Sequence, residues 1–462
     1  MKKILSLTFI ALLSNLIFGQ INPKKCITTN LVKQELERNS EYETMRQNLI
    51  NYRLENKAIN QKTQSTIIIP VVVHVIHRIS HQNIGSGTNI SDAQIEDALR
   101  ILNEDFSKTN PEFPSPPRNT FLNNWGNPNL QFCLATEDPN GNPTTGITRT
   151  STTQQNWDAD DDNNNDPCHE ANGMKKTACG GNDGWDPSRY MNIWICDLTN
   201  SSGAGTTLGY AYLPGLLANN PFDPSSYDDD YKDGLVVDYR YFGTIGITVP
   251  STDGRTATHE IGHYLGLMHT FCEQGGGCCD NDNNIFGGFV DDTPAAEDIY
   301  FGIVWSATNN NSCNDLNYSN IFTSDVLDMD ENFMSYAANT WMFSNGQVNT
   351  MTNVLNRSES NYGRNALKNS TVPTNCSGII SSVDNYENEN INIYPNPTQD
   401  IIYIKSNSKI NKIVVYNILG KEILTTNDLN EYINLTSLNN GIYLVNVYTD
   451  THIYSERIVI ER

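Results

Sequence analysis

The stretch that decides the interpretation of this chain is HEIGHYLGLMH, residues 259–269. On an α-helix His259 and His263 stand four residues apart and share one face, so their imidazoles can bind one zinc ion. Gly266 can adopt a positive φ at little cost, which allows the helix to end and the chain to turn. That turn would return His269 as a third ligand. Three protein ligands leave a fourth position open, which indicates a catalytic rather than a structural zinc site.

The motif is specific. A bare HExxH occurs by chance in roughly one per cent of chains of this length, and the added glycine and third histidine lower that frequency about a thousandfold. The chain has eight histidines, and three of them fall within this motif. A helix with three solvent-exposed histidines is therefore a weak alternative. Glu260 adjoins the first ligand and is placed to act as the general base on a water molecule.

The N-terminus has the pattern of a secretory signal peptide, which we expect over residues 1–20. Two lysines precede an apolar run from Ile4 to Phe18, and the small residue Gly19 follows. This run is short for a membrane span, although a membrane anchor is the alternative interpretation. No later stretch is long and apolar enough, so we expect a mature protein without a membrane span, secreted or held at the cell surface.

The chain has a formal net charge of −23, which argues against nucleic acid as a partner. Acidic runs occur at residues 158–166 and 228–230. Clustered carboxylates of this kind can bind calcium, but a solvated loop is the simpler interpretation.

Ten cysteines in an exported chain predict disulfides. Cys26 stands alone near the N-terminus, and nine more lie between Cys133 and Cys376. Nine is an odd number, so we expect at least one unpaired downstream thiol, unless a segment is trimmed. The spacing does not predict the pairing.

Residues 21–64 are polar, with a helical pattern around 31–54, and are interpreted as a pro-segment. Its Cys26 could cap the zinc, because a thiolate is a strong zinc ligand and would displace the catalytic water. The alternative is that Cys26 pairs elsewhere or has no such role.

Residues 65–372 are expected to form a mixed α/β catalytic domain. The segment 66–78, TIIIPVVVHVIHR, has the β-branched composition of a buried strand, so His74 and His77 are expected as strand residues rather than metal ligands. Ser91 is placed to cap a helix. Further extended segments are expected at 130–135, 190–198, 208–213 and 235–241. We expect a twisted sheet that supports the zinc helix.

A loop rich in glycine, cysteine and aspartate, residues 273–294, follows the metal motif. Its alternating acidic residues match half of an EF-hand loop, but Ile285 stands where the tight-turn glycine belongs, so no EF-hand is expected. We favour a calcium site using Asp291, Asp292 and Thr293 over an acidic loop that is only stapled by disulfides.

The segment NFMSY, residues 332–336, carries two further candidate residues. Met334 could pack beneath the zinc histidines, because its side chain is soft and unbranched. Tyr336 could offer its phenol to the developing oxyanion. Taken alone, either residue fits an ordinary core better.

The composition changes after about residue 372. Residues 373–390 are linker-like, and residues 391–462 alternate apolar and polar positions over short runs separated by turn residues. That pattern predicts a small all-β sandwich without a catalytic constellation. A carbohydrate-binding or adhesive module is the alternative.

The metal motif and NFMSY together resemble the metzincin clan of zinc endopeptidases, and residues 66–360 resemble its pappalysin family. The matching stretches are IPVVVHVIH (69–77), WDPSRYMNIWIC (185–196), GYAYLP (209–214), VDDTP (290–294) and FSNGQ (343–347). The resemblance implies zinc ligands at His259, His263 and His269, a general base at Glu260, a Met-turn at Met334, a metal-side or transition-state contact at Tyr336, and calcium near VDDTP. Relatives with an aspartate five residues after the Met prefer basic substrates. Here that position is Asn339, which leaves the preference open.

The last seventy or so residues resemble the sorting domain of the type IX secretion system. The matches are YPNP (394–397), VVYNILGKEI (414–423) and GIYLVNV (441–447), and they imply the secretion machinery as a partner. The sequence as a whole predicts a secreted zinc endopeptidase, made as a latent proenzyme and acting on proteins or peptides. The alternatives are an adhesion protein with an inactive metal motif and a hydrolase acting on something other than protein.

Overall fold

The computed structural model describes most of two compact units, residues 1–381 and 382–462. The described residues are 26–38, 44, 47–48, 51, 65–161, 168, 170–199, 207–214, 232–272, 277–278, 290–297, 299–318, 321–358, 363–376, 392–406, 410–417, 422–426, 432–449 and 453–462. The expected signal peptide, most of the pro-segment and the acidic run at 228–230 lie outside these residues.

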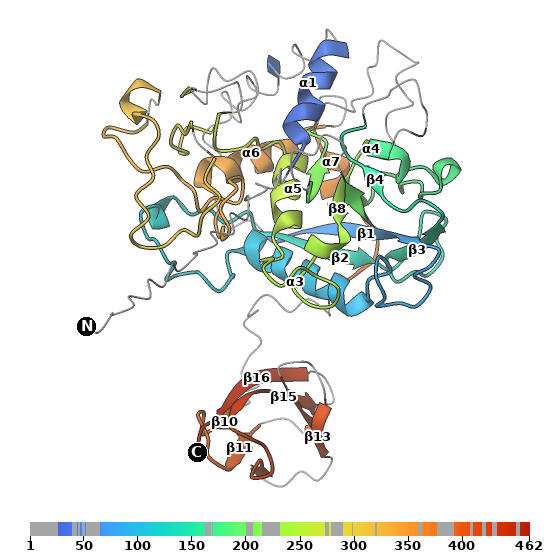
Figure 1. The fold of residues 1–462 in the computed structure, drawn as a ribbon, viewed down its shortest axis with the longest axis vertical. Helices are drawn as coiled ribbons and strands as arrows, with labels where there is room; N and C mark the ends of the chain where they lie inside the picture. The colour runs from blue at the N-terminus through green and yellow to red at the C-terminus, as the bar shows by residue number, and fades with distance from the viewer. Residues whose placement is uncertain are drawn as a thin grey trace, which may run out of the picture. The chain divides into compact units, whose positions relative to one another are not determined.

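The first unit is built on a seven-stranded mixed sheet (Figure 1). Its strands follow the order β7-β8-β5-β1-β2-β9, and β3 also pairs with β1. Pairing is parallel except at the edges, where β7 is antiparallel to β8 and β9 is antiparallel to β2. The strand bounds are β1 Ile67–Arg78, β2 Leu130–Ala135, β3 Ile147–Thr152, β5 Met191–Cys196, β7 Gly209–Ala211, β8 Leu235–Asp238 and β9 Thr374–Asn375, with β4 Trp157–Asp158 and β6 Leu198–Thr199 as a separate parallel pair.

Helices cover the sheet. Their bounds are α1 Thr28–Arg38, α3 Asp92–Ser107, α4 Glu170–Gly173, α5 Thr256–Tyr264, α6 Asn345–Asn356 and α7 Asn365–Lys368, with short 3-10 turns at 122–124, 177–179, 239–241 and 315–317. Ser91 caps α3 by accepting a hydrogen bond from the Gln94 N–H, as the sequence predicts.

Strand β1 is buried on both faces, which explains its continuous β-branched run. Alternate residues of the strand, including Val71 and Val73, join the main core together with apolar residues of α3, α5 and α6. On the other face Ile76 belongs to a second cluster, which also contains Ile27, Leu31 and Val32 of the pro-segment. The sheet therefore carries the zinc helix on one side and supports the pro-segment from the other.

His74 is a strand residue with satisfied ring nitrogens. It contacts the Thr148 hydroxyl at 2.8 Å and the Asn192 side-chain oxygen at 3.0 Å. Burial lowers the pKa of His74 to about 4, so its imidazole is neutral at physiological pH. His77 likewise lies in β1 and is buried.

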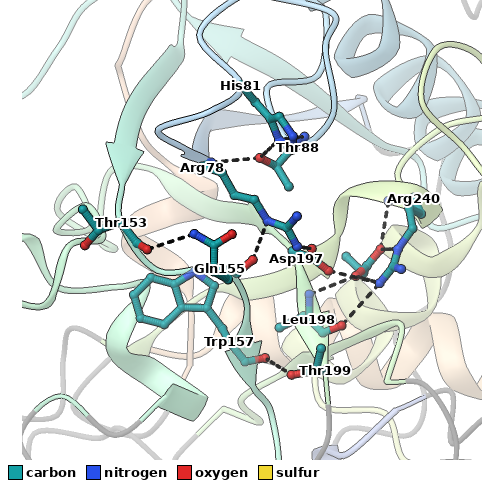
Figure 2. Close-up of polar contacts among 11 residues, drawn as sticks. Arg78, His81, Thr88, Thr153, Gln155, Trp157, Asp197, Leu198, Thr199 and Arg240 are labelled. Atoms are coloured by element: carbon teal, nitrogen blue, oxygen red, sulfur yellow. Dashed lines mark hydrogen bonds and ion pairs between the residues drawn. The ribbon is translucent and has the colours of Figure 1, made fainter.

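An ionic cluster ties together the carboxyl ends of β1, β5 and β8 (Figure 2). Figure 2 shows Arg78, Asp197 and Arg240 pointing toward one another, and the Arg240 guanidinium also pairs with Asp238 at 2.7 Å. Asp238 further accepts a hydrogen bond from the Leu198 N–H at 2.9 Å. Two carboxylates and two guanidiniums compensate each other there, so the cluster holds strand ends rather than offering an unpaired charge.

Three disulfides are described: Cys133–Cys376, Cys168–Cys179 and Cys278–Cys313. Cys272 is also disulfide-bonded. The odd downstream thiol that the cysteine count predicts is Cys196, which is buried in the second cluster.

The first unit extends further along the chain than the sequence indicates. A linker is predicted from residue 373, but strand β9 and Cys376 belong to the catalytic sheet through pairing with β2 and the disulfide to Cys133. A two-residue strand has no periodicity from which it could be recognised.

The second unit is an all-β sandwich with its own core, as predicted. A three-stranded sheet has the order β10-β11-β14 and a four-stranded sheet the order β13-β12-β15-β16, with antiparallel pairing throughout. The bounds are β10 Asn392–Tyr394, β11 Ile401–Lys405, β12 Ile410–Asn417, β13 Glu422–Thr426, β14 Tyr432–Asn434, β15 Gly441–Thr449 and β16 Ile453–Ile460. Among the described helices of the whole chain, none is long and apolar enough to cross a membrane.

Candidate metal centre

Helix α5 presents the first two histidines of the motif, and the chain then turns back. The helix ends at Tyr264, and Gly266 has a φ of +93°, the left-handed conformation that glycine adopts most easily. The Leu267 N–H then bonds to the carbonyl of Gly262 at 2.9 Å. This turn brings His269 back to the helix, as the sequence predicts.

The three imidazoles converge on one point. The Nε2 atoms of His259, His263 and His269 lie 3.1–3.2 Å from one another. All three side chains are buried. Tetrahedral zinc with Zn–N bonds of about 2.0–2.1 Å places its nitrogen ligands about 3.3 Å apart. The observed spacing therefore matches a zinc site.

Backbone carbonyls fix which nitrogen of each helical histidine faces the centre. His259 Nδ1 lies 2.7 Å from the carbonyl of Phe333, and His263 Nδ1 lies 2.7 Å from that of Leu267. A carbonyl only accepts, so each Nδ1 carries the proton and each Nε2 presents a lone pair. Lone pairs facing each other at this distance repel unless a cation lies between them. The donor set thus fits a divalent metal.

The electrostatic environment favours the metal-binding form of His263. Burial, reinforced by the neighbouring His269 and His259, lowers the pKa of His263 well below its usual value. A neutral imidazole is the form that binds zinc.

Glu260 lies next to the centre, deep in the protein. Its Oε1 is buried and accepts no hydrogen bond within the described part of the chain, whereas Oε2 lies 3.4 Å from the Cys26 sulfur. Burial raises the pKa of Glu260 well above the usual range, and the contacts with Cys26 and Thr28 oppose that shift. A carboxylate with one uncommitted oxygen beside a metal site can exchange a proton with a water molecule or a substrate.

Cys26 occupies the fourth corner of the site. Its sulfur and the three histidine nitrogens all lie within 4.8 Å of one another. Within the described residues this is the one group with the geometry of a metal site. The structure thus brings together the pro-segment thiol and the three predicted ligands.

The pro-segment lies along the edge strand β7. Cys26 forms a parallel β-bridge with Gly209, and the Thr28 hydroxyl bonds to both the carbonyl and the N–H of Ala211 at 3.0 and 3.2 Å. Thr29 Oγ1 also lies 3.4 Å from His269 Nδ1. Residues 26–29 therefore cover the centre, through the β-bridge of Cys26 and the first residues of helix α1.

Met334 and Tyr336 lie where the sequence predicts. A Cβ added at Gly262 would collide with the Met334 sulfur, so this side chain packs directly beneath the zinc helix. The Tyr336 ring lies 5.7 Å from the ring of His259 and 4.9 Å from that of His269. Its hydroxyl donates to the Cys26 carbonyl at 3.3 Å. Both residues thus belong to the site rather than to a remote core.

The predicted calcium residues lie together on one turn, but the Asp292 carboxylate also bonds to residues at the start of helix α6. Its carboxylate accepts hydrogen bonds from the Ser344 hydroxyl at 2.6 Å and the Gly346 N–H at 2.9 Å. It therefore contacts the N-terminal end of helix α6. The Thr293 hydroxyl donates to the Val290 carbonyl. These contacts do not test calcium binding, which stays a prediction for Asp291, Asp292 and Thr293.

Asn339 is held by the backbone of Val304. Its side-chain oxygen accepts from the Val304 N–H at 2.7 Å, and its amide donates to the Val304 carbonyl at 2.9 Å. The side chain is neutral and both of its polar ends are engaged. It therefore offers no charge to a basic substrate side chain.

Sequence reasoning missed the groups that hold the ligands in place. The carbonyls of Phe333 and Leu267 carry no signal in residue type, since every residue has one. Arg255 and Asp105 do have distinctive side chains, but their contact across 150 positions follows only from the fold.

The comparisons with known proteins agree with this geometry. Residues 176–356 match the peptidase family described as Pregnancy-associated plasma protein-A, and residues 392–461 match the family described as Secretion system C-terminal sorting domain. A solved structure of a promirolysin mutant from Tannerella forsythia is 31% identical, covers 75% of this chain and 97% of its own, and has a TM-score of 0.55.

Fungal relatives also match. An extracellular metalloprotease of Sordaria macrospora is 33% identical over 165 residues, which cover 34% of this chain. The chain spans 47% of that relative's length, about half. An extracellular metalloprotease of Arthroderma gypseum is 24% identical over 306 residues, which cover 66% of this chain and 78% of the relative.

The fold and the three-histidine centre define a metzincin-like metallopeptidase domain. The chain belongs to the pappalysin family and carries a C-terminal secretion sorting domain. A sorting domain of this kind marks an exported protein, and the predicted localisation is confirmed.

Proposed function

We propose that the mature protein is a zinc-dependent endopeptidase that hydrolyses peptide bonds in extracellular proteins or peptides. The observation that carries the proposal is the convergence of three imidazole nitrogens beside the buried carboxyl group of Glu260. The edge strand β7 adds support, because an edge strand can bind an extended peptide through its backbone groups.

Each side chain has a defined role in this mechanism. Zinc, when bound by the three histidines, would act as a Lewis acid and lower the pKa of a water molecule toward neutrality. Glu260 is placed to accept a proton from a water molecule and to return it to the leaving amine. Tyr336 donates its phenolic hydrogen to the oxygen on which negative charge develops. Met334 supports the helix from below.

The decisive experiment replaces Glu260 by Gln. The variant should retain stoichiometric zinc, because the three histidines are untouched, and lose about 10²–10⁴-fold in kcat on a casein-derived peptide library. Zinc is measured by metal analysis and cleavage by mass spectrometry of the fragments. Glu104→Gln is the matched control, since Glu104 pairs only with Arg100 on helix α3.

Two results would contradict the proposal. One is that the Glu260→Gln variant cleaves peptides at the wild-type rate, because Glu260 would then not be the general base. The other is cleavage by the wild type that persists when a chelator has removed the metal. Cleavage of esters or sugars but of no peptide would instead favour a different hydrolase.

We further propose that the chain is made as a latent proenzyme. The thiolate of Cys26 would take the fourth ligand position, and Tyr336 would hold the same residue through its carbonyl. Helix α1 would anchor the segment, because its apolar residues share a core cluster with the catalytic unit.

Two finer assignments are also proposals. Calcium would bind at Asp291, Asp292 and Thr293, where two adjacent carboxylates lie on one turn. The C-terminal unit would address the protein to type IX secretion machinery, supported by the family match over residues 392–461.

A further inference from the structure

A buried ionic cluster lies at the start of the zinc helix and has no part in the mechanism above. Arg255 precedes helix α5 and is its N-cap residue. Asp105 comes from helix α3, and Glu112 from the segment that follows it. Asp105 is 1% exposed and Arg255 is 9% exposed. Charged groups are rarely buried to this degree without a specific task.

The Arg255 guanidinium joins three separate segments. Its Nε donates to Asp105 Oδ1 at 3.2 Å. Its two terminal nitrogens donate to the two oxygens of Glu112 at 3.0 and 2.8 Å, a bidentate pair. One of them also donates to the carbonyl of Thr340 at 2.6 Å. A planar fork with fixed donor directions makes these bonds together, and a lysine ammonium cannot reproduce them.

The same cluster contacts the residue before His259 in the chain and the residue whose carbonyl bonds to His259 Nδ1. Thr258 immediately precedes His259, and its hydroxyl donates to Asp105 Oδ2 at 2.7 Å. The guanidinium also lies 5.7 Å from the centre of the Phe333 ring, and the carbonyl of Phe333 is the group that orients His259.

A purely structural ion pair would not require this arrangement. The cluster contacts Thr258, which precedes His259 on the helix, and the ring of Phe333, whose carbonyl accepts from His259 Nδ1. Because these contacts surround His259, a loosened cluster would tilt this ligand relative to the other two. Metal affinity depends steeply on such ligand orientation.

We propose that Arg255, together with Asp105, is a positioning residue of the metal centre that sets the orientation of His259. It acts through Thr258 and Phe333 and does not touch substrate. The inference rests on the proposed zinc peptidase function, and it predicts effects on zinc affinity and kcat rather than on substrate binding.

Arg255→Lys and Thr258→Val are each made in the full chain, matured, and compared with Arg240→Lys treated in the same way. Arg240 also pairs with buried or nearly buried carboxylates, but these are Asp197 and Asp238 at strand ends, not Asp105 and Glu112. Thr258→Val removes a single hydroxyl bond, so it keeps the test informative if the arginine variant does not fold. Zinc affinity is measured on the metal-free protein by competition with a chromophoric chelator, kcat and KM on one peptide, and Tm by calorimetry.

Arg255→Lys should lose at least tenfold in zinc affinity and tenfold in kcat, with KM within twofold of the wild type. Thr258→Val should show the same pattern at a smaller size. Arg240→Lys should lower Tm and leave zinc affinity and kcat within twofold. Unchanged zinc affinity in both cluster variants, beside a zinc-binding wild type, would overturn the positioning role. A wild type that binds no zinc would instead overturn the proposed function.

Discussion

At the scale of single residues, Gly262 shows how closely the site is packed. It lies between Glu260 and His263 on helix α5, and a Cβ at this position would collide with the Met334 sulfur and lie 3.5 Å from Phe343. The motif predicts the histidines and the glutamate from their chemistry, but the need for glycine here follows from the Met side chain beneath the helix.

We expect Gly262→Ala to lower the free energy of unfolding by about 1–3 kcal/mol, the usual cost of overpacking a filled core. It should also reduce zinc content, because the methyl group pushes the helix off Met334. Chemical denaturation and metal analysis measure the two effects.

Met334→Ala supplies the control for this prediction. If the collision is the cause, Gly262→Ala should cost less in the Met334→Ala background than in the wild type, since the smaller side chain makes room. Strictly additive losses in the double variant would show that the collision is not responsible.

Residue type explains what the sequence could and could not predict at this scale. The candidate zinc ligands, Glu260 and Cys26 were recognisable because their side chains carry the chemistry. Met334 and Tyr336 were recognisable through the family resemblance. Asp292 was expected as a calcium ligand and contacts the N-terminal end of α6. A carboxylate suits both tasks, so residue type does not predict the bond to Ser344, and calcium binding stays a prediction.

At the scale of elements, long patterned segments were predicted well and short ones poorly. Strands β1 and β2 agree with their predicted ranges to within a residue, and helix α3 begins after the predicted cap Ser91. Strand β9 was assigned to a linker. The predicted helix at 31–54 overlaps α1, Thr28–Arg38, and most of its remainder lies outside the described residues.

Latency is a property at the scale of elements, because helix α1 holds the segment that carries Cys26 against the catalytic unit. In the unprocessed chain we expect Cys26→Ala to raise activity at least tenfold over the parent, since alanine cannot occupy the fourth position of the metal. Activity should remain below that of the mature protein, because α1 and the bridge to Gly209 still cover the centre. Cleavage of a quenched fluorescent peptide measures both.

Cys196→Ala is the matched control for latency. It removes the other buried thiol, which lies in strand β5 and not at the metal group. This variant should stay latent. Equal activity of the Cys26→Ala chain and its parent would show that the thiol does not silence the enzyme.

At the scale of the whole molecule, the chain consists of two units with separate cores. The zinc ligands and Glu260 lie in the first unit, as does the Cys133–Cys376 disulfide. The disulfide closes a loop of 243 residues and joins the end of that unit to the central sheet. The first unit therefore contains every group that the proposed reaction uses.

We expect a chain ending at residue 381 to keep kcat within about twofold of the full chain after maturation, and to show the same thermal transition for the catalytic unit.

A chain ending at residue 372 is the control. It lacks β9 and Cys376, and it should be less stable by about 2–5 kcal/mol, the usual contribution of a long-loop disulfide. Both chains are exported with an unrelated signal and compared by peptide cleavage and calorimetry. If the chain ending at 381 loses activity, the second unit contributes to catalysis; if the chain ending at 372 is equally stable, the unit ends before β9.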